Sequence, residues 1–206
     1  ASMSVSVESK SGCCHTRLEH RLDHLNFRTG NTLRYLIFMR LAHNIGDIKH
    51  SNYHTREQIA RCGEPIGFDG VYRSVYENRD VLEGKSGIMF VMGNFIGGTN
   101  GFDLENVPQL ERYCTLGEVK ELCHEYDFEI GWHTWSHRNL CNLSEKEIFQ
   151  EITAPFETKY LRYPYGEYND KVIECVMRAG YEEAYAVTQG VHAHPYKIFS
   201  NYVDFS

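Results

Sequence analysis

Hydrophobic and polar positions follow two different patterns along the chain, and the pattern changes near residue 66. Residues 15–65 are rich in charge and histidine, and their apolar positions are three or four residues apart, which predicts helix and loop. These apolar positions are Leu33, Leu36, Ile37 and Leu41. Beyond residue 66, short apolar runs typical of strands occur at 66–69, 88–92, 128–132, 160–163 and 185–188. Segments of helical spacing separate these runs, so the sequence predicts alternating strands and helices around a parallel sheet.

Four helix starts are indicated by capping residues. A Ser or Thr followed three positions later by Glu or Gln forms a capping box, because each side chain can bond to the backbone of the other residue. Such boxes are present at Thr55, Thr115 and Ser144. Asn169 is a predicted N-cap of a further helix, which Gly180 ends.

Composition narrows the class of protein. The chain has 206 residues, 42% of them hydrophobic, which suits one domain with a buried core. Its net charge of −7 argues against broad nucleic-acid binding, which needs a basic face. No apolar run approaches the roughly 20 residues that span a bilayer, and residues 1–10 do not have the pattern of a signal peptide. An odd number of cysteines, seven, favours reduced thiols, so we expect a cytoplasmic protein without a membrane span.

Three polar residues stand where predicted strands end. They are Asp69, His133 and Arg162. In parallel α/β folds the chemistry gathers at the carboxyl ends of the strands, so these side chains are candidates for one site. Each also has a simpler interpretation: Asp69 precedes Gly70 as in many turns, and Arg162 lies near a proline turn. If Arg162 pairs with a buried carboxylate instead, it holds that carboxylate ionised.

His133 and His137 are candidate metal ligands. A separation of four residues on one turn of helix directs both imidazoles at one ion. Thr134 and Ser136 could then orient the two rings through hydrogen bonds. The alternative is a pair of surface or capped histidines.

Three segments in order resemble the polysaccharide deacetylase family (carbohydrate esterase family 4, the NodB-homology domain). The family carries T-F-D-D-G, then H-[ST]-x-x-H, then R-x-P-Y. The matching segments here are 67–71 (GFDGV), 133–137 (HTWSH) and 162–165 (RYPY), and the resemblance spans residues 64–205. It implies a distorted (β/α) barrel of about seven strands. We therefore expect one domain over residues 1–206, with residues 1–63 as a helical and loop region packed on the barrel.

The resemblance also implies a reaction: removal of an N-acetyl or related acyl group from an amino sugar, in a glycan or its precursor. In the family a divalent metal polarises the carbonyl and activates water. By correspondence, His133 and His137 hold this metal, with zinc expected first and cobalt, nickel or manganese as alternatives. Asp69 is the general base, Arg162 orients it, and the backbone N–H of Tyr165 helps to hold the oxyanion. Candidate sugar-contacting residues are Trp135, Tyr163 and Tyr72.

The first motif departs from the family at Gly70. In gap-free register Asp69 is the base and Gly70 replaces a metal-binding Asp, which leaves two protein ligands. A shift by one residue makes Asp69 the metal ligand and places Phe68 at the position of the base. Other carboxylates that could reach the ion are Glu77, Asp80 and Asp103. If Gly70 is only a lost ligand, Gly70→Asp is expected to raise metal affinity more than tenfold, or by about 1.4 kcal/mol.

In the family, the general acid is a histidine of a late L-x-H motif, and this sequence has no such motif. Some members begin with a strand that ends in Tyr-His, and the nearest equivalent here is Cys14-His15. His192 and His194 are further candidates. Two functions follow: an active deacetylase acting on a glycan or a lipopolysaccharide precursor, or a catalytically impaired relative that binds carbohydrate or a partner.

Overall fold

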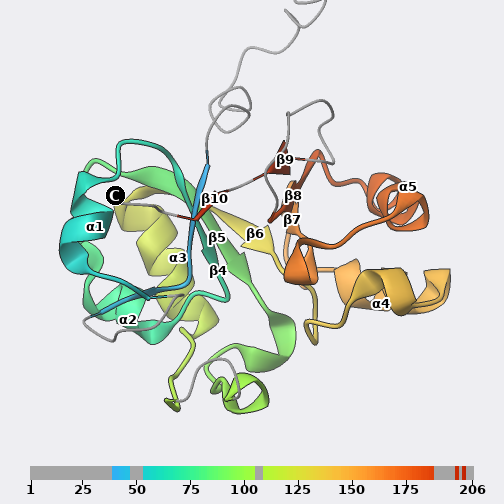
Figure 1. The fold of residues 1–206 in the computed structure, drawn as a ribbon, viewed down its shortest axis with the longest axis horizontal. Coiled ribbons are helices and arrows are strands. Elements are labelled where there is room, and N and C mark those ends of the chain that lie inside the picture. Colours follow the sequence, from blue (N-terminus) through green and yellow to red (C-terminus); the bar gives the residue numbers. More distant parts are fainter. Residues whose placement is uncertain (1–38, 47–52, 105–108, 188–197, 200, 203–206) are drawn as a thin grey trace, which may run out of the picture. The chain divides into compact units, whose positions relative to one another are not determined.

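The computed structural model describes residues 39–46, 53–104, 109–187, 198–199 and 201–202, within one compact unit of residues 33–206. A sheet of eight parallel strands runs in the order β10-β1-β4-β5-β6-β7-β8-β9 (Figure 1). The strands are β1 (Arg40–Ala42), β4 (Ile66–Asp69), β5 (Ser86–Val91), β6 (Asp127–Trp132), β7 (Tyr160–Arg162), β8 (Glu183–Ala186), β9 (Ile198–Phe199) and β10 (Asn201–Tyr202). Separately, β2 (Asn44–Ile45) pairs with β3 (Tyr53–His54).

The two edges of the sheet belong to neighbouring parts of the chain. Only residue 200 separates β9 from β10, which are the opposite edges in the strand order. Because consecutive Cα atoms are about 3.8 Å apart, these edges lie close together and the sheet curls into a barrel-like form. The predicted distorted (β/α) barrel is confirmed, with eight strands where about seven were expected.

Four of the five described α-helices, all except α2 (Arg73–Glu77), begin where the capping residues predicted them. The helices are α1 (Arg56–Arg61), α2 (Arg73–Glu77), α3 (Leu116–Glu125), α4 (Glu145–Ile152) and α5 (Asp170–Arg178). Thr55, Thr115 and Ser144 each form a complete capping box, and the side chain of Asn169 accepts a hydrogen bond from the Val172 N–H. Short 3₁₀ turns occur at Arg79–Leu82, Gly93–Phe95, Gly101–Asp103, Leu140–Asn142 and Pro164–Gly166.

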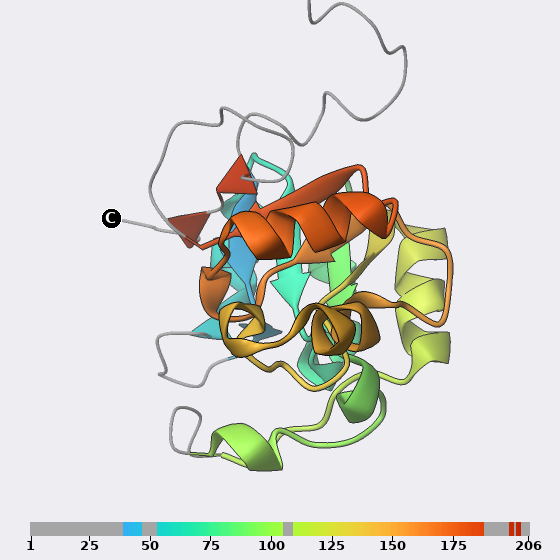
Figure 2. The ribbon, with the colours of Figure 1, turned by 90° about the vertical axis from the view of Figure 1, so that its right-hand side faces the viewer.

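The sheet is buried on both faces. Ile88 and Phe90 of β5 pack in one cluster with Met39, Tyr160 and Tyr185. The alternate residues of the same strand, Met89 and Val91, join a second cluster that includes side chains of α1, α2 and α3. Residues of α4 and α5 form a third cluster with β7 and β8, and Figure 2 shows these two helices (gold and orange) in front of the strands. Burial on both faces explains the uninterrupted apolar run at 88–92.

One sequence prediction about the N-terminal region is wrong. Leu41, expected in a helix, lies in strand β1 between β4 and β10. A short apolar run looks the same in a buried helix and a buried strand, so spacing alone did not separate them. Leu33, Leu36 and Ile37 lie outside the described residues, as does most of the 1–63 region that was expected to pack on the barrel.

Two general features of the described residues complete the fold. None of their helices has both the length and the apolar character needed to cross a membrane. Five cysteines lie in this part of the chain, and none of them forms a disulfide.

Candidate active site

Asp69 and Arg162 form a buried ion pair at the carboxyl ends of two strands. Asp69 ends β4 and Arg162 ends β7. The Nε–H of Arg162 donates a hydrogen bond of 3.0 Å to Oδ2 of Asp69. Only 5% of Asp69 and 0% of Arg162 is exposed. A buried charge is costly without an opposite charge beside it, and in this pair each of the two groups supplies that partner to the other.

His133 follows β6 and faces this ion pair. Its Nδ1–H donates a 2.9 Å hydrogen bond to the carbonyl oxygen of Arg162. The other ring nitrogen, Nε2, lies 3.9 Å from Oδ2 of Asp69. Burial lowers the pKa of His133 to about 3, so its ring is neutral at neutral pH. A neutral imidazole with one nitrogen anchored to a carbonyl is the form in which histidine binds metals.

His137 approaches His133 by a different route from the one predicted. Segment 133–139 is a loop and not a helical turn. Thr134 (φ 67°) and His137 (φ 57°) both adopt left-handed backbone conformations that a right-handed helix cannot contain. The two imidazole centroids are nevertheless 4.7 Å apart, and burial lowers the pKa of His137 to about 3. The hydroxyl of Thr134 accepts the His137 backbone N–H at 3.1 Å, and this fixes the turn.

Glu151, which the sequence analysis missed, holds this loop in place. Its carboxylate accepts hydrogen bonds from the backbone N–H of Ser136, at 2.8 Å, and from the Ser136 hydroxyl. Its carbonyl oxygen accepts the Trp135 N–H at 3.1 Å and the Trp132 Nε1–H at 2.9 Å. Ser136 therefore bonds to Glu151 and not to a histidine, contrary to the prediction. The available signal was a carboxylate on the apolar face of α4, next to Ile148 and Ile152.

His43 is a second site residue that the sequence analysis missed. In the β1–β4 register Ala42 lies opposite Phe68, so the next residue, His43, comes beside Asp69. Burial lowers the pKa of His43 to about 4, and the charge of Asp69 acts in the opposite direction. The signal was again a polar residue directly after a buried strand. The other candidate acids, His15, His192 and His194, lie outside the described residues.

The described residues do not complete the family's metal-binding set. Within them, no group of three His, Cys, Asp or Glu side chains is placed to hold one ion. Glu77 and Asp80 instead pair with Arg73 and Arg56 at the surface, and the Asp103 side chain lies outside the described part. Two observations still suit a ligand: Oδ1 of Asp69 and Nδ1 of His137 are buried without a hydrogen bond to any described residue.

The side chains of Met92 and Tyr113 occupy the space that a side chain at position 70 would need. Gly70 has φ +82°, and a Cβ there would come within 2.9 Å of both the Met92 methyl and the Tyr113 ring. Arg162 bonds to Asp69, and the roles of Asp69 as the base and of Gly70 in place of a ligand stay predictions. A metal site of the usual three protein ligands therefore does not fit the described residues.

The predicted sugar-contacting residues have different surroundings. Tyr163 is 0% exposed and packs in the α4–α5 cluster, so its ring cannot stack on a sugar. Tyr72 is also buried, and its hydroxyl accepts a 3.1 Å hydrogen bond from Tyr113. Tyr165, in contrast, is 62% exposed, and its ring centroid is 4.7 Å from that of His137.

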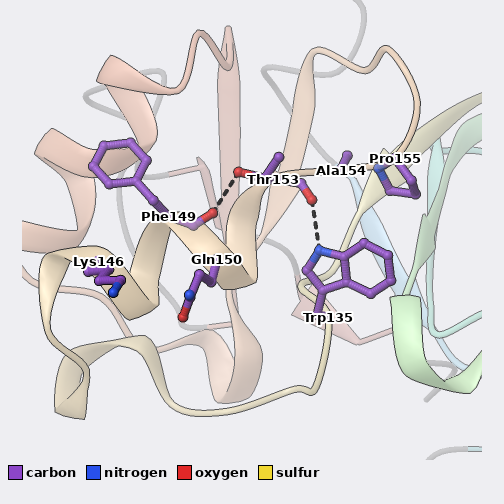
Figure 3. Close-up of a pocket in the computed structure, with 7 residues that line it drawn as sticks. All are labelled: Trp135, Lys146, Phe149, Gln150, Thr153, Ala154 and Pro155. Carbon is purple, nitrogen blue, oxygen red and sulfur yellow. Dashed lines mark hydrogen bonds between the residues drawn. The ribbon is translucent and has the colours of Figure 1, made fainter.

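Trp135 points into a separate open groove of about 660 Å³. Figure 3 shows its indole below the end of α4, where Nε1–H donates a 2.8 Å hydrogen bond to the Thr153 carbonyl. The groove is lined by Trp135, Lys146, Phe149, Gln150, Thr153, Ala154 and Pro155. Asp69, His133, His137 and Arg162 do not line it, so the Trp135 ring contributes to a surface distinct from the ion pair.

Comparison with known families identifies this arrangement. The family model described as polysaccharide deacetylase matches residues 83–184, which include both histidines and Arg162. The chain belongs to the polysaccharide deacetylase family. No curated protein matches it in sequence.

Solved structures of polysaccharide deacetylases share the fold. The Streptococcus pyogenes deacetylase PplD is 14% identical, with a TM-score of 0.64 over 81% of this chain and 91% of PplD. IcaB from Ammonifex degensii is 16% identical, with a TM-score of 0.65 over 82% of this chain and 91% of IcaB. The deacetylase domain of Bordetella bronchiseptica BpsB is 12% identical, with a TM-score of 0.59 over 81% and 95%. This member of the polysaccharide deacetylase family thus has the fold of these structural relatives.

Proposed function

We propose that the protein is a hydrolase that removes an N-acetyl or related acyl group from an amino sugar in glycan or lipopolysaccharide metabolism. The observation that carries this proposal is the buried Asp69–Arg162 ion pair beside the neutral imidazole of His133. Structural relatives include a deacetylase in complex with acetate and a de-N-acetylase, and these names support an acetyl group as the one removed.

In the proposed reaction Asp69 takes a proton from water, and the oxygen of that water attacks the acyl carbon. Arg162 fixes the position of the Asp69 carboxylate through its hydrogen bond to Oδ2. The carbon–nitrogen bond then breaks, and the departing amine needs a proton. His43, beside Asp69, relays the proton from Asp69 to the amine nitrogen, which yields the carboxylic acid and the free amino sugar. The role of the Tyr165 backbone N–H towards the oxyanion stays a prediction.

A divalent metal on His133 and His137 also stays a prediction, and no step above runs through it. Protein purified without chelator and analysed for metal content tests it directly. About one equivalent of zinc, cobalt, nickel or manganese that is lost in His133→Ala supports the prediction. The same low content in both proteins contradicts it.

Acetate release from N-acetylated amino-sugar oligosaccharides tests the proposed reaction. Loss of a general base typically costs 10²–10⁴-fold in rate, so Asp69→Asn should lower acetate release by about that factor. Asp80→Asn is the matched control, because Asp80 is an exposed carboxylate that pairs with Arg56. No acetate release by the unaltered protein, or equal release by both variants, would refute the proposal.

A second variant tests the reaction without disturbing the buried ion pair, since Asp69→Asn could lose activity through misfolding alone. Asp69→Asn leaves the buried Arg162 cation without its partner, which costs about 3–5 kcal/mol of folding free energy. His43→Gln removes the relay and leaves the ion pair intact. We expect slower acetate release at unchanged thermal stability in this variant.

The alternative function, a carbohydrate- or partner-binding relative without activity, is favoured by one observation. The ring of Tyr113 and the methyl of Met92 fill the space at Gly70 where the family has a ligand. Oligosaccharide binding without acetate release, unchanged in Asp69→Asn, would support this alternative.

A further inference from the structure

Phe102 presents an exposed aromatic ring at the edge of the candidate active site. It lies in the 3₁₀ turn Gly101–Asp103, in the connection between β5 and α3. Its exposed fraction is 46%, large for an apolar side chain. Its ring centroid lies 6.0 Å from that of His137. Exposed apolar rings next to a site with convergent polar groups are typical of surfaces that contact a ligand.

One face of the Phe102 ring is supported from behind. Phe95 stacks on it at a centroid distance of 4.2 Å and an interplanar angle of 28°. Phe95 in turn lies 6.1 Å from the ring of Tyr113, which packs on Tyr72 at 4.4 Å in a buried cluster. This series of ring contacts supports Phe102, while 46% of the residue remains exposed to solvent.

Tyr165 borders the same site from a different part of the chain. Its ring also contacts His137, at 4.7 Å, and is 62% exposed. Two exposed aromatic rings therefore flank one imidazole, Phe102 from the β5–α3 connection and Tyr165 from the turn after β7. The nearby residues Asp69, His133 and Arg162 are buried.

We propose that the Phe102 ring, supported by Phe95, is a platform that binds the apolar face of a hexosamine ring whose acyl group faces His137. This inference rests on the proposed function and names a subsite for its substrate. A pyranose ring carries C–H groups on its faces and hydroxyls at its rim, so its face matches a flat aromatic surface while the hydroxyls remain in water.

Binding measured by NMR titration tests the platform without requiring turnover. The probes are the N-acetylglucosamine tetramer and the corresponding glucosamine tetramer, each titrated against full-length protein. We expect Phe102→Ala to weaken binding of both probes about tenfold, and Phe102→Trp to retain binding within twofold of the unaltered protein. Met177→Ala, which truncates a 50% exposed apolar side chain on α5, is the matched control and should bind like the unaltered protein.

The outcomes separate this inference from the proposed hydrolysis. Weakened binding of the acetylated probe alone would mean that Phe102 contacts the acyl group, and this overturns the platform. Unchanged binding in Phe102→Ala, equal weakening in Met177→Ala, or no binding by the unaltered protein also overturns it. Tetramer binding that depends on Phe102 but yields no acetate supports the platform and refutes the hydrolase.

Discussion

At the scale of single residues, Gly70 determines whether a third metal ligand can be restored. The sequence alone suggested that Gly70→Asp would raise metal affinity more than tenfold. The structure changes this expectation, because position 70 has φ +82° and a Cβ there meets the Met92 methyl and the Tyr113 ring at 2.9 Å. A left-handed conformation costs a residue with a Cβ about 1–2 kcal/mol. The substitution therefore adds strain and crowding before its carboxylate can reach an ion.

We predict that Gly70→Asp leaves zinc affinity within twofold of the unaltered protein and lowers the free energy of unfolding by about 1–3 kcal/mol. Calorimetric titration with zinc and urea unfolding measure the two quantities. Gly70→Ala is the control, since it adds the Cβ without the carboxylate and should lose similar stability. A tenfold gain in zinc affinity in Gly70→Asp but not in Gly70→Ala would show that Met92 and Tyr113 move aside and that the new carboxylate binds the ion.

At the scale of elements, α4 positions the loop that carries both histidines. Glu151 bonds to this loop through its carboxylate and its carbonyl oxygen, and α4 itself is fixed by the Ser144 capping box. Neither Thr134 nor His137 has a backbone conformation typical of non-glycine residues, so the surrounding bonds must hold the loop in this form. The geometry of the two histidines thus depends on a helix that contributes no group to the chemistry.

Truncation of the Glu151 side chain should therefore lower activity more than it lowers the stability of the fold. We predict that Glu151→Ala lowers acetate release at least tenfold, and that Glu151→Gln, which keeps one acceptor oxygen, loses less. Glu145→Ala is the control, because Glu145 is an exposed residue of the same helix that pairs with Arg178. Steady-state kinetics together with thermal unfolding check this. Equal activity in Glu151→Ala and Glu145→Ala would show that the loop keeps its form without the carboxylate.

The elements also show which features the sequence could predict. Capping boxes depend on residues three positions apart, so Thr55, Thr115 and Ser144 marked their helices correctly. The pairing of Asp69 with Arg162 was predictable from their places at strand ends. His43 was missed because its strand β1 is set by β4 and β10, both remote in sequence. Glu151 was missed because its partners depend on how the loop folds back on α4.

At the scale of the whole molecule, the buried histidines should make stability depend on pH. Burial lowers the pKa of His133 and His137 to about 3 and that of His43 to about 4. Unfolded histidine has a pKa near 6.5, so below this pH the unfolded chain binds more protons than the folded chain. The free energy of unfolding then falls as pH drops from about 6.5 towards 4, by up to about 1.4 kcal/mol per pH unit for each histidine.

Urea unfolding at pH 7 and pH 5 measures this loss. We expect the midpoint of unfolding to decrease at pH 5, and to decrease less in a His43→Gln variant, which has one such group fewer. A midpoint that is the same at both pH values would contradict the burial of neutral imidazoles.

Glu183 has the opposite effect on stability from the buried histidines, because it destabilises the fold as pH rises. It therefore provides a separate prediction. It begins β8, is 1% exposed, and accepts a hydrogen bond from the Tyr185 hydroxyl. Burial raises the pKa of Glu183 to about 7. Since the folded chain then binds more protons than the unfolded chain between pH 4.5 and 7, this group lowers stability as pH rises through that range. Above pH 7 the full cost of a buried charge is present.

We therefore predict that Glu183→Gln stabilises the protein by about 1–3 kcal/mol at pH 8 and has little effect at pH 4.5. The amide oxygen of Gln can still accept the Tyr185 hydrogen bond, so packing is preserved while the charge is removed. Glu182→Gln is the matched control, because Glu182 is a partly exposed neighbour that pairs with Lys159. Urea unfolding of the three proteins at both pH values measures the effect. Equal gains at pH 4.5 and pH 8 would mean that the gain comes from packing and not from removal of a buried charge.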